Sequence, residues 1–383
     1  MVAKVGKQFT DLGWMIHPIL IKVLTLLIIL CIGPLVALPR TGATTFEIGI
    51  RPLFPQLSPI WFSMFFFAIA LALSISKTKI VDIIGRFLTP FLLAVLFLLI
   101  VLGIVSPTVP VEVTSLQAAE SFVFGFTEGY QTMDALGSPL MAGIVISDLI
   151  RRGYHDKEVQ FKVSVQVGIV AFILLALVYG GLTYAGATVG GHFNGETERT
   201  VLLIGMVELM LGNVGKVFMG IAVALACLTT STGLSSTCGN YFETISGGKL
   251  KYKQIVCVCV AIAFVLSLIG VDGLIAIAVP ILSAIYPVII VLIFMSIFDK
   301  KIKYNWTYTG AVIGAFAVAL IESINLASIM RGGNLLAGAA KACASLPLGT
   351  YGFEWVVPAL VCSIVLTLIS AVAKVGKTIN DPL

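Results

Sequence analysis

The sequence predicts an all-α membrane protein that crosses the bilayer many times. Of its 383 residues, 58% are hydrophobic and only 11% are charged, against about 25% charged in an ordinary soluble domain. The mean hydropathy is +1.07. Apolar runs long enough to span a bilayer recur along the whole chain, and no soluble domain separates them. We therefore interpret residues 1–383 as a single transmembrane domain.

Ten apolar segments account for most of the chain. A helix needs about 20 apolar residues to cross a hydrocarbon core of about 30 Å. The segments are 17–38, 57–76, 83–105, 118–150, 159–186, 213–242, 252–270, 273–298, 306–327 and 353–373. The stretch 198–211 is too short to span and carries charged residues, so we expect it to form a helix over the outer face.

The basic residues predict the orientation of these segments. If the amino terminus is cytoplasmic, 18 Lys and Arg residues fall on the inner side and 6 on the outer side. Cytoplasmic loops of membrane proteins are enriched in these residues. We therefore expect a multi-pass protein of the cytoplasmic membrane, with both termini inside.

The fourth segment, 118–150, differs from the others because its middle is polar. Thr127, Glu128 and Asp134 lie between two apolar arms, and glycines and a proline flank them. An acid at the bilayer centre costs about 3 kcal/mol on insertion scales, so it normally faces a cavity or a partner. The pattern predicts half-helices at 118–126 and 132–150 with an unwound joint, as in transporter binding sites. The alternative is a surface loop between two helices, whose arms would be too short to span.

Two other motifs have more than one interpretation. Pro34 and Pro39 predict a kink or an end of the first helix, and Arg40 either pairs with an acid such as Glu47 or extends to the membrane surface. Seven hydroxyl residues occupy the nine positions of 229–237. They either bond back to their own helix or, with a freed carbonyl such as that of Ala226, bind a hard cation such as sodium.

The sequence offers little evidence for enzyme chemistry. Seven cysteines and three histidines show no metal-ligand spacing, and no nucleophile–base pair falls within an apolar segment. Asp272 precedes a glycine at a predicted turn, which is ordinary turn chemistry. We predict that the protein is not an enzyme and uses no cofactor other than a coupling cation.

Four stretches together resemble the bacterial branched-chain amino acid:cation symporters. They are GPLVALPRTGATTFEIG (33–49), GFTEGYQTMDALG (125–137), ACLTTSTGL (226–234) and VPILSAIYP (279–287). The resemblance covers nearly the whole chain. It implies uptake of leucine, isoleucine and valine, driven by sodium or protons, by alternating access. It also implies the leucine-transporter-like fold, in which two inverted five-helix repeats enclose a midplane site.

The resemblance also implies site residues. The fourth segment resembles that fold's broken sixth helix, whose joint would bind the amino acid. The electronegative end of the first half-helix would suit the ammonium group. The substrate-binding candidates are Phe126, Thr127, Glu128, Gly129, Tyr130, Met133 and Asp134. The sixth segment resembles that fold's eighth helix, where Ala226, Thr229 and Thr230 would occupy the sodium-ligand positions.

One departure from the family pattern bears on function. The family's first helix carries a Phe-Gly-Ala-Gly-Asn-like stretch that supplies half of the substrate and ion sites, and this sequence has no such stretch. The resemblance therefore implies that this sequence lacks the family's first two helices, roughly 50–70 residues at about 20 per span, and that Met1 is either the true start or an internal methionine. The alternative to a transporter is a non-transporting binder or inactive remnant with half a site.

Overall fold

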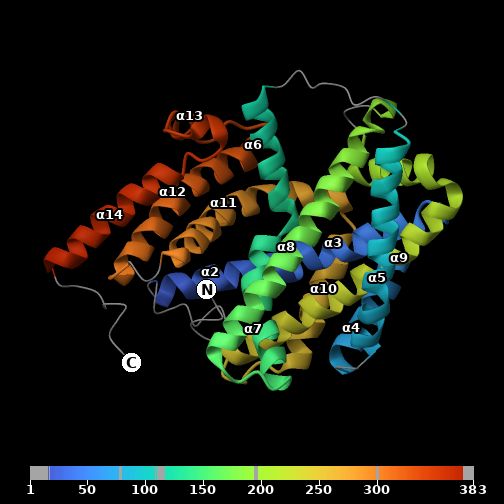
Figure 1. Cartoon of the computed structure of the whole chain (residues 1–383), viewed down its shortest axis with the longest axis horizontal. Helices are drawn as coiled ribbons and strands as arrows, with labels where there is room; N and C mark the ends of the chain where they lie inside the picture. The colour runs from blue at the N-terminus through green and yellow to red at the C-terminus, as the bar shows by residue number, and fades with distance from the viewer. Residues whose placement is uncertain are drawn as a thin grey trace. The chain divides into compact units, whose positions relative to one another are not determined.

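The computed structural model describes residues 16, 18–76, 80–107, 109, 117–193, 197–298 and 302–373. Within these ranges the secondary structure is helical, with no β-strand (Figure 1). The chain divides into two compact units, each built from separate stretches of sequence. Unit 1 comprises 1–28, 115–167 and 276–383, and unit 2 comprises 29–114 and 168–275. The prediction that both termini are cytoplasmic concerns residues that lie outside the described ranges.

Most of the described helices follow the predicted apolar segments closely. In chain order they are α2 (Pro18–Leu30), η2 (Cys31–Leu35), α3 (Ala37–Thr44), η3 (Thr45–Ile50), α4 (Pro59–Ser76), α5 (Ile80–Val105), α6 (Ala118–Gly129), η4 (Tyr130–Thr132), α7 (Asp134–Arg151), α8 (Lys157–Ala187), η5 (Gly190–His192), α9 (Arg199–Ile245), α10 (Tyr252–Ser267), α11 (Val271–Ile297), α12 (Asn305–Ile329), α13 (Ala337–Ala344), η7 (Gly349–Tyr351) and α14 (Val356–Ala373). Among the described residues, five helical stretches are long and apolar enough to cross a membrane, and four shorter helices are also apolar. An all-α membrane protein is therefore confirmed, and the number of ten spans stays a prediction.

The first helix extends further than its apolar run predicts. The boundary at residue 38 is wrong, because one helical stretch continues to Ile50. Pro34 and Pro39 lack the N–H that an α-helix needs. The chain accommodates Pro34 within the π-helix η2, where Gly33 leaves helical geometry at φ −89° and ψ −122°. The prolines therefore lie in a kinked helix that continues, and most of the expected link at 39–56 is helical.

The predicted boundary between the charged stretch 198–211 and the apolar segment 213–242 is confirmed, and it lies within α9. Gly212 interrupts the helix with φ +65° and ψ −162°, a backbone conformation open to glycine because it has no Cβ. The break separates the short charged stretch 199–211 from the apolar helix that begins at residue 213.

Small residues allow close helix packing within unit 2. A Cβ added to Gly49 on η3 would lie 3.0 Å from the carbonyl oxygen of Gly220 on α9. The Tyr252 hydroxyl of α10 donates to the Ser74 carbonyl at 2.9 Å and contacts the Ser236 hydroxyl at 3.0 Å. These contacts join α4, α9 and α10. Membrane helices pack in this way because lipid supplies no hydrophobic force between them.

In unit 1, α12 and α14 run side by side (Figure 1). Gly310 and Gly314 are four residues apart on α12. A Cβ at these positions would meet the carbonyl groups of Cys362 and Pro358 on α14, respectively. The pair forms the small-residue motif that brings two membrane helices into backbone contact.

We expect Gly314→Val to lower the thermal stability of the detergent-solubilised protein strongly. Overpacking costs about 1–3 kcal/mol in an adaptable core, and here the obstacle is backbone. Gly180→Val is the matched control, since Gly180 lies in the apolar helix α8 with nothing within 4 Å of an added Cβ. Equal melting temperatures for the two variants would contradict this packing.

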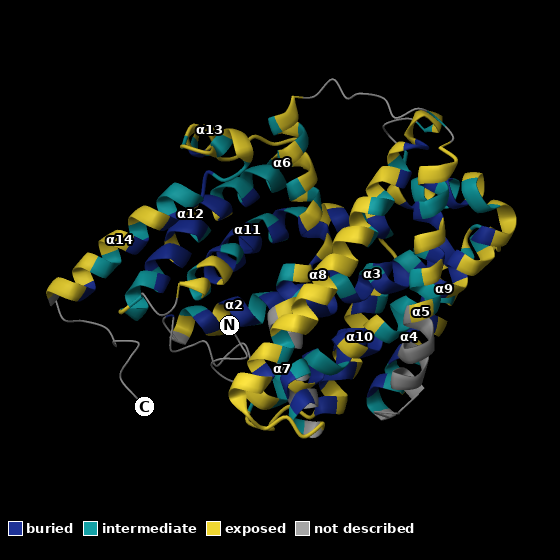
Figure 2. Cartoon of the chain, viewed as in Figure 1, coloured by how far each residue is buried: buried dark blue, intermediate teal, exposed yellow. Residues whose placement is uncertain are grey.

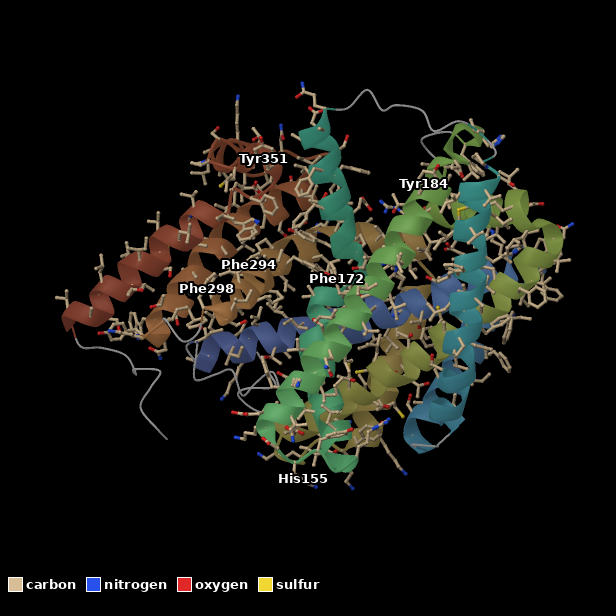
Figure 3. The ribbon with its side chains drawn as sticks, viewed as in Figure 1. His155, Phe172, Tyr184, Phe294, Phe298 and Tyr351 are labelled. Atoms are coloured by element: carbon tan, nitrogen blue, oxygen red, sulfur yellow. The ribbon has the colours of Figure 1, made fainter. Side chains whose placement is uncertain are left out.

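Of the five candidate spans among the described residues, α8 is the least buried, and Figure 2 shows much of it exposed. None of its most apolar 18-residue window is buried, and Phe172, labelled in Figure 3, is 72% exposed. Phe294 of α11 and Phe298, the residue after the end of that helix, are also exposed (Figure 3). A helix with apolar side chains on all faces is stable in lipid or when covered by other apolar helices.

Candidate functional site

The fourth segment is broken, as the sequence predicts, but the break lies later in the chain. The first half-helix α6 continues through Thr127 and Glu128 to Gly129, so the predicted end at 126 is wrong. The Thr127 hydroxyl bonds back to the carbonyls of Val123 and Phe124 at 2.9 and 3.0 Å. Polar residues and glycine are compatible with helix here because the hydroxyl finds its partner within the helix.

The backbone turns at Met133. After the short 3-10 turn η4, Met133 adopts a left-handed conformation with φ +59°, which costs a non-glycine residue roughly 1–2 kcal/mol. Its carbonyl then accepts the N–H groups of Leu136 and Gly137 at 3.2 and 2.9 Å, at the start of α7. Backbone strain of this kind clusters at functional sites.

The structure separates the seven substrate-binding candidates by exposure. Tyr130 and Met133 are buried, at 7% and 8% exposed. Phe126 and Glu128 are half-buried, whereas the other three are exposed: Thr127, Gly129 and Asp134. Tyr130 and Met133, the two candidates for the apolar pocket that lie nearest the turn, are therefore the ones that pack inward.

An aromatic cluster surrounds the joint within unit 1. Tyr130 stacks on Tyr286 of α11 with ring centroids 4.2 Å apart and an angle of 20° between the rings. Phe126 meets Tyr130 edge-on at 5.3 Å and Phe353 at 4.9 Å. Phe353 in turn contacts Trp355 at 6.0 Å. The joint thus has an apolar, aromatic wall contributed by α6, η4, α11 and the link before α14.

Two carboxyl groups, which we call the carboxyl pair, lie beside this wall. Glu322 of α12 and Glu354 of the link before α14 share a side-chain hydrogen bond. Two ionised carboxylates cannot hydrogen-bond to each other, so a bond between these side chains forms only when one of them carries a proton. Glu354 is 7% exposed, and both carboxyls act electrostatically on the Tyr130 phenol.

The carboxyl pair also influences a thiol on α13, the short helix in the link between α12 and α14. Cys343 of α13 is buried, and burial, followed by Glu322 and Glu354, raises the pKa of its thiol. Groups of three or more His, Cys, Asp or Glu that could hold a metal ion are absent from the part of the chain that the structure describes. The groups that the structure brings together at the joint offer aromatic contact and hydrogen bonding.

The helix α11 is weakened beside Tyr286. Pro280 and Pro287 lie inside it, and Pro287 has no N–H to bond the Ser283 carbonyl. The Ser323 hydroxyl of α12 donates to the Pro280 carbonyl at 2.6 Å. The Ser283 carbonyl therefore lacks its usual helical N–H partner, whereas the Pro280 carbonyl has one in Ser323.

The hydroxyl run of α9 largely bonds back to its own helix. The Thr229 hydroxyl donates to the Ala226 carbonyl at 2.9 Å, while Thr230 is exposed. The Ser231 hydroxyl is fully buried and has no hydrogen-bond partner among the described residues. The three sodium candidates, Ala226, Thr229 and Thr230, therefore lie on one helix of unit 2, and the unsatisfied Ser231 hydroxyl lies next to them in the sequence.

Sequence reasoning missed Glu322, Glu354, Tyr286 and Phe353. A signal for Glu322 was available, because it is the one acid in the segment 306–327 and an acid within a span marks function by default. Tyr286 lies in the family-like stretch 279–287, but nothing in that pattern assigns it to the site. Phe353 and Glu354 begin the segment 353–373 and carry no such signal.

These features define a class of protein: a helical membrane carrier whose fourth segment is broken beside an aromatic and acidic cluster. The family model for the branched-chain amino acid transport protein matches residues 1–373. The chain belongs to this family. It is therefore a transport protein of the membrane and not an enzyme.

Individual relatives agree with this assignment. The chain is 31% identical to the branched-chain amino acid permease BraB of Bacillus subtilis, over 99% of this chain and 86% of that protein. It is 31% identical to the permease BrnQ of the same organism, over 95% and 84%. It is 32% identical to the branched-chain amino acid transport system 2 carrier protein of Pseudomonas aeruginosa, over 88% and 77%. No solved structure matches the chain.

Proposed function

We propose that this protein imports leucine, isoleucine and valine across the cytoplasmic membrane by cation symport and alternating access. The observation that carries the proposal is the broken fourth segment, with its strained Met133 and its aromatic wall. Apolar walls with a few polar groups are typical of small-molecule sites. The names of the relatives supply the substrate class.

The carboxyl pair favours the proton as the coupling ion. The side chains of Glu322 and Glu354 lie within hydrogen-bonding reach of each other, so the pair can share a proton, and both carboxyls influence the Tyr130 phenol at the joint. Acids at membrane depth serve as proton relays in transporters. Binding of substrate against Tyr130 would change the surroundings of the pair and couple proton release to movement of the helices.

The transport proposal is tested with the purified protein in sealed vesicles. We expect radiolabelled leucine to accumulate when the outside is made acidic relative to the inside, and unlabelled isoleucine and valine to compete. A protonophore should abolish the accumulation. Leucine binding without accumulation under any imposed gradient would favour the non-transporting alternative.

Sodium is the second candidate, favoured by the buried Ser231 hydroxyl beside Thr230. If sodium binds there, Thr230→Ala should raise the sodium concentration for half-maximal uptake by roughly tenfold, since a bond to a charged group contributes about 1.5–3 kcal/mol. Thr237→Ala is the control, because its hydroxyl bonds back to Gly233 at 2.9 Å. An unchanged sodium dependence in Thr230→Ala would exclude this site.

A further inference from the structure

Unit 2 contains a cavity that the proposed transport mechanism does not use. Its volume is about 330 Å³, at the small end of the roughly 300–1,000 Å³ of small-molecule pockets. It lies between η3 and the turn that joins α10 to α11. The orientation predicted from the basic residues places both elements at the outer side. The cavity is therefore open to small solutes from outside on that orientation.

One wall of the cavity carries a negatively charged and a positively charged side chain. Glu47 and Arg51 lie four residues apart, around a π-turn in which the Arg51 N–H bonds the Phe46 carbonyl at 2.8 Å. π-turns inside helices are frequent at functional sites. No ion pair between Glu47 and Arg51 is present in the described part of the chain. The two charges are therefore separately available to a ligand.

The carboxylate of Glu47 is held in place. Its Oε1 accepts the Val271 N–H at 2.9 Å, at the first turn of α11. Gly270 has φ +85°, and a Cβ there would lie 3.0 Å from the same oxygen, so glycine makes this approach possible. One bond leaves further acceptor positions on the carboxylate. Capping of α11 explains Glu47 alone, but it does not explain Arg51 or the cavity.

The rest of the lining is mostly apolar. Phe46, Leu57, Leu268 and Ile269 contribute side chains, and Leu57, Leu268 and Ile269 are between 39% and 50% exposed in the absence of a ligand. A ligand that satisfies this lining has a cationic group for Glu47, an anionic group for Arg51 and an apolar body. A guanidinium binds a carboxylate through two parallel hydrogen bonds.

We propose that this cavity binds an aliphatic amino acid in its zwitterionic form, at a second site separate from the joint. The choice of an amino acid over other zwitterions rests on the proposed transport function. A phosphatidylethanolamine headgroup also carries a cationic and an anionic group, and the test below separates it from a free amino acid. The bound amino acid would place its carboxylate on Arg51 and its side chain on the apolar wall.

The test counts leucine molecules bound to the purified full chain in phosphatidylethanolamine-free nanodiscs, by equilibrium dialysis with radiolabelled leucine. We expect about two per protein. Arg51→Gln should weaken one of them by at least about tenfold, since it removes a two-bonded charged contact. Arg331→Gln, at an exposed arginine of unit 1, is the matched control and should retain both.

The proposal would be overturned if the Arg51→Gln variant bound as much leucine as the wild type, with the same affinity. So would a second site that disappears when phosphatidylethanolamine is added, since a lipid headgroup would then be the natural occupant. The outcome is independent of transport. If the wild type shows no uptake but Arg51→Gln still loses one bound leucine, the transport proposal fails and the cavity assignment stands.

Discussion

Glu322→Gln is expected to reduce proton-driven leucine accumulation strongly while leaving leucine binding close to that of the wild type. A glutamine amide can donate a hydrogen bond to Glu354 without a proton between the two groups. The contact survives, but the exchangeable proton of the pair is lost. We expect accumulation in an imposed pH gradient to fall at least about tenfold, within the 1–3 kcal/mol of ordinary coupling energies.

The measurement compares uptake with the outside acidic and with no gradient, alongside leucine binding to the same preparation. Glu158→Gln is the control, because Glu158 is exposed at the start of α8. Accumulation of leucine by Glu322→Gln at the wild-type level would show that the carboxyl pair is structural. Loss of both binding and accumulation would mean that the carboxyl pair maintains the structure of the leucine site and does not couple proton movement to transport.

Tyr130→Ala is expected to weaken leucine binding by about tenfold or more. The change removes the stack on Tyr286 at 4.2 Å and the edge contact with Phe126 at 5.3 Å. An aromatic pair contributes about 0.5–1.5 kcal/mol beyond its buried area, and truncating a buried aromatic ring costs about 3–5 kcal/mol. The joint should therefore lose its apolar wall as well as part of its stability.

Tyr130→Phe separates the ring from the hydroxyl. It retains both ring contacts, so leucine affinity should stay within about threefold of the wild type, less than 1 kcal/mol. Binding and melting temperature are measured together for the two variants. A Tyr130→Ala protein that melts earlier but binds leucine normally would assign this ring to packing alone.

Much of the helical architecture was predictable from apolar run length. The segments at 159–186 and 306–327 agree closely with α8 and α12, because a span needs a length of apolar sequence whatever surrounds it. The break at Gly212 was also predictable, since charge changes to apolar character there. The end of the first helix was not, because accommodation of Pro34 depends on a π-turn that only the packed backbone reveals.

The candidate site was partly predictable. Local composition, with polar residues between apolar arms, indicated that the fourth segment breaks. It did not indicate that the turn lies at Met133, because the left-handed conformation of a methionine has no sequence signature. The carboxyl pair and the Tyr286 stack join residues far apart in the chain. Such contacts depend on how helices pack, which a single sequence does not encode in any local pattern.

The sequence by itself determined the class of protein, its helices and the segment that breaks, since these depend on local composition and on the cost of exposing backbone in lipid. The tertiary structure alone decided which side chains meet at the break. Glu322, Glu354 and Tyr130 come from three separate elements, as do the walls of the Glu47–Arg51 cavity. Their juxtaposition follows from close helix packing, as where Gly314 lies against α14, and this packing is a property of the folded chain.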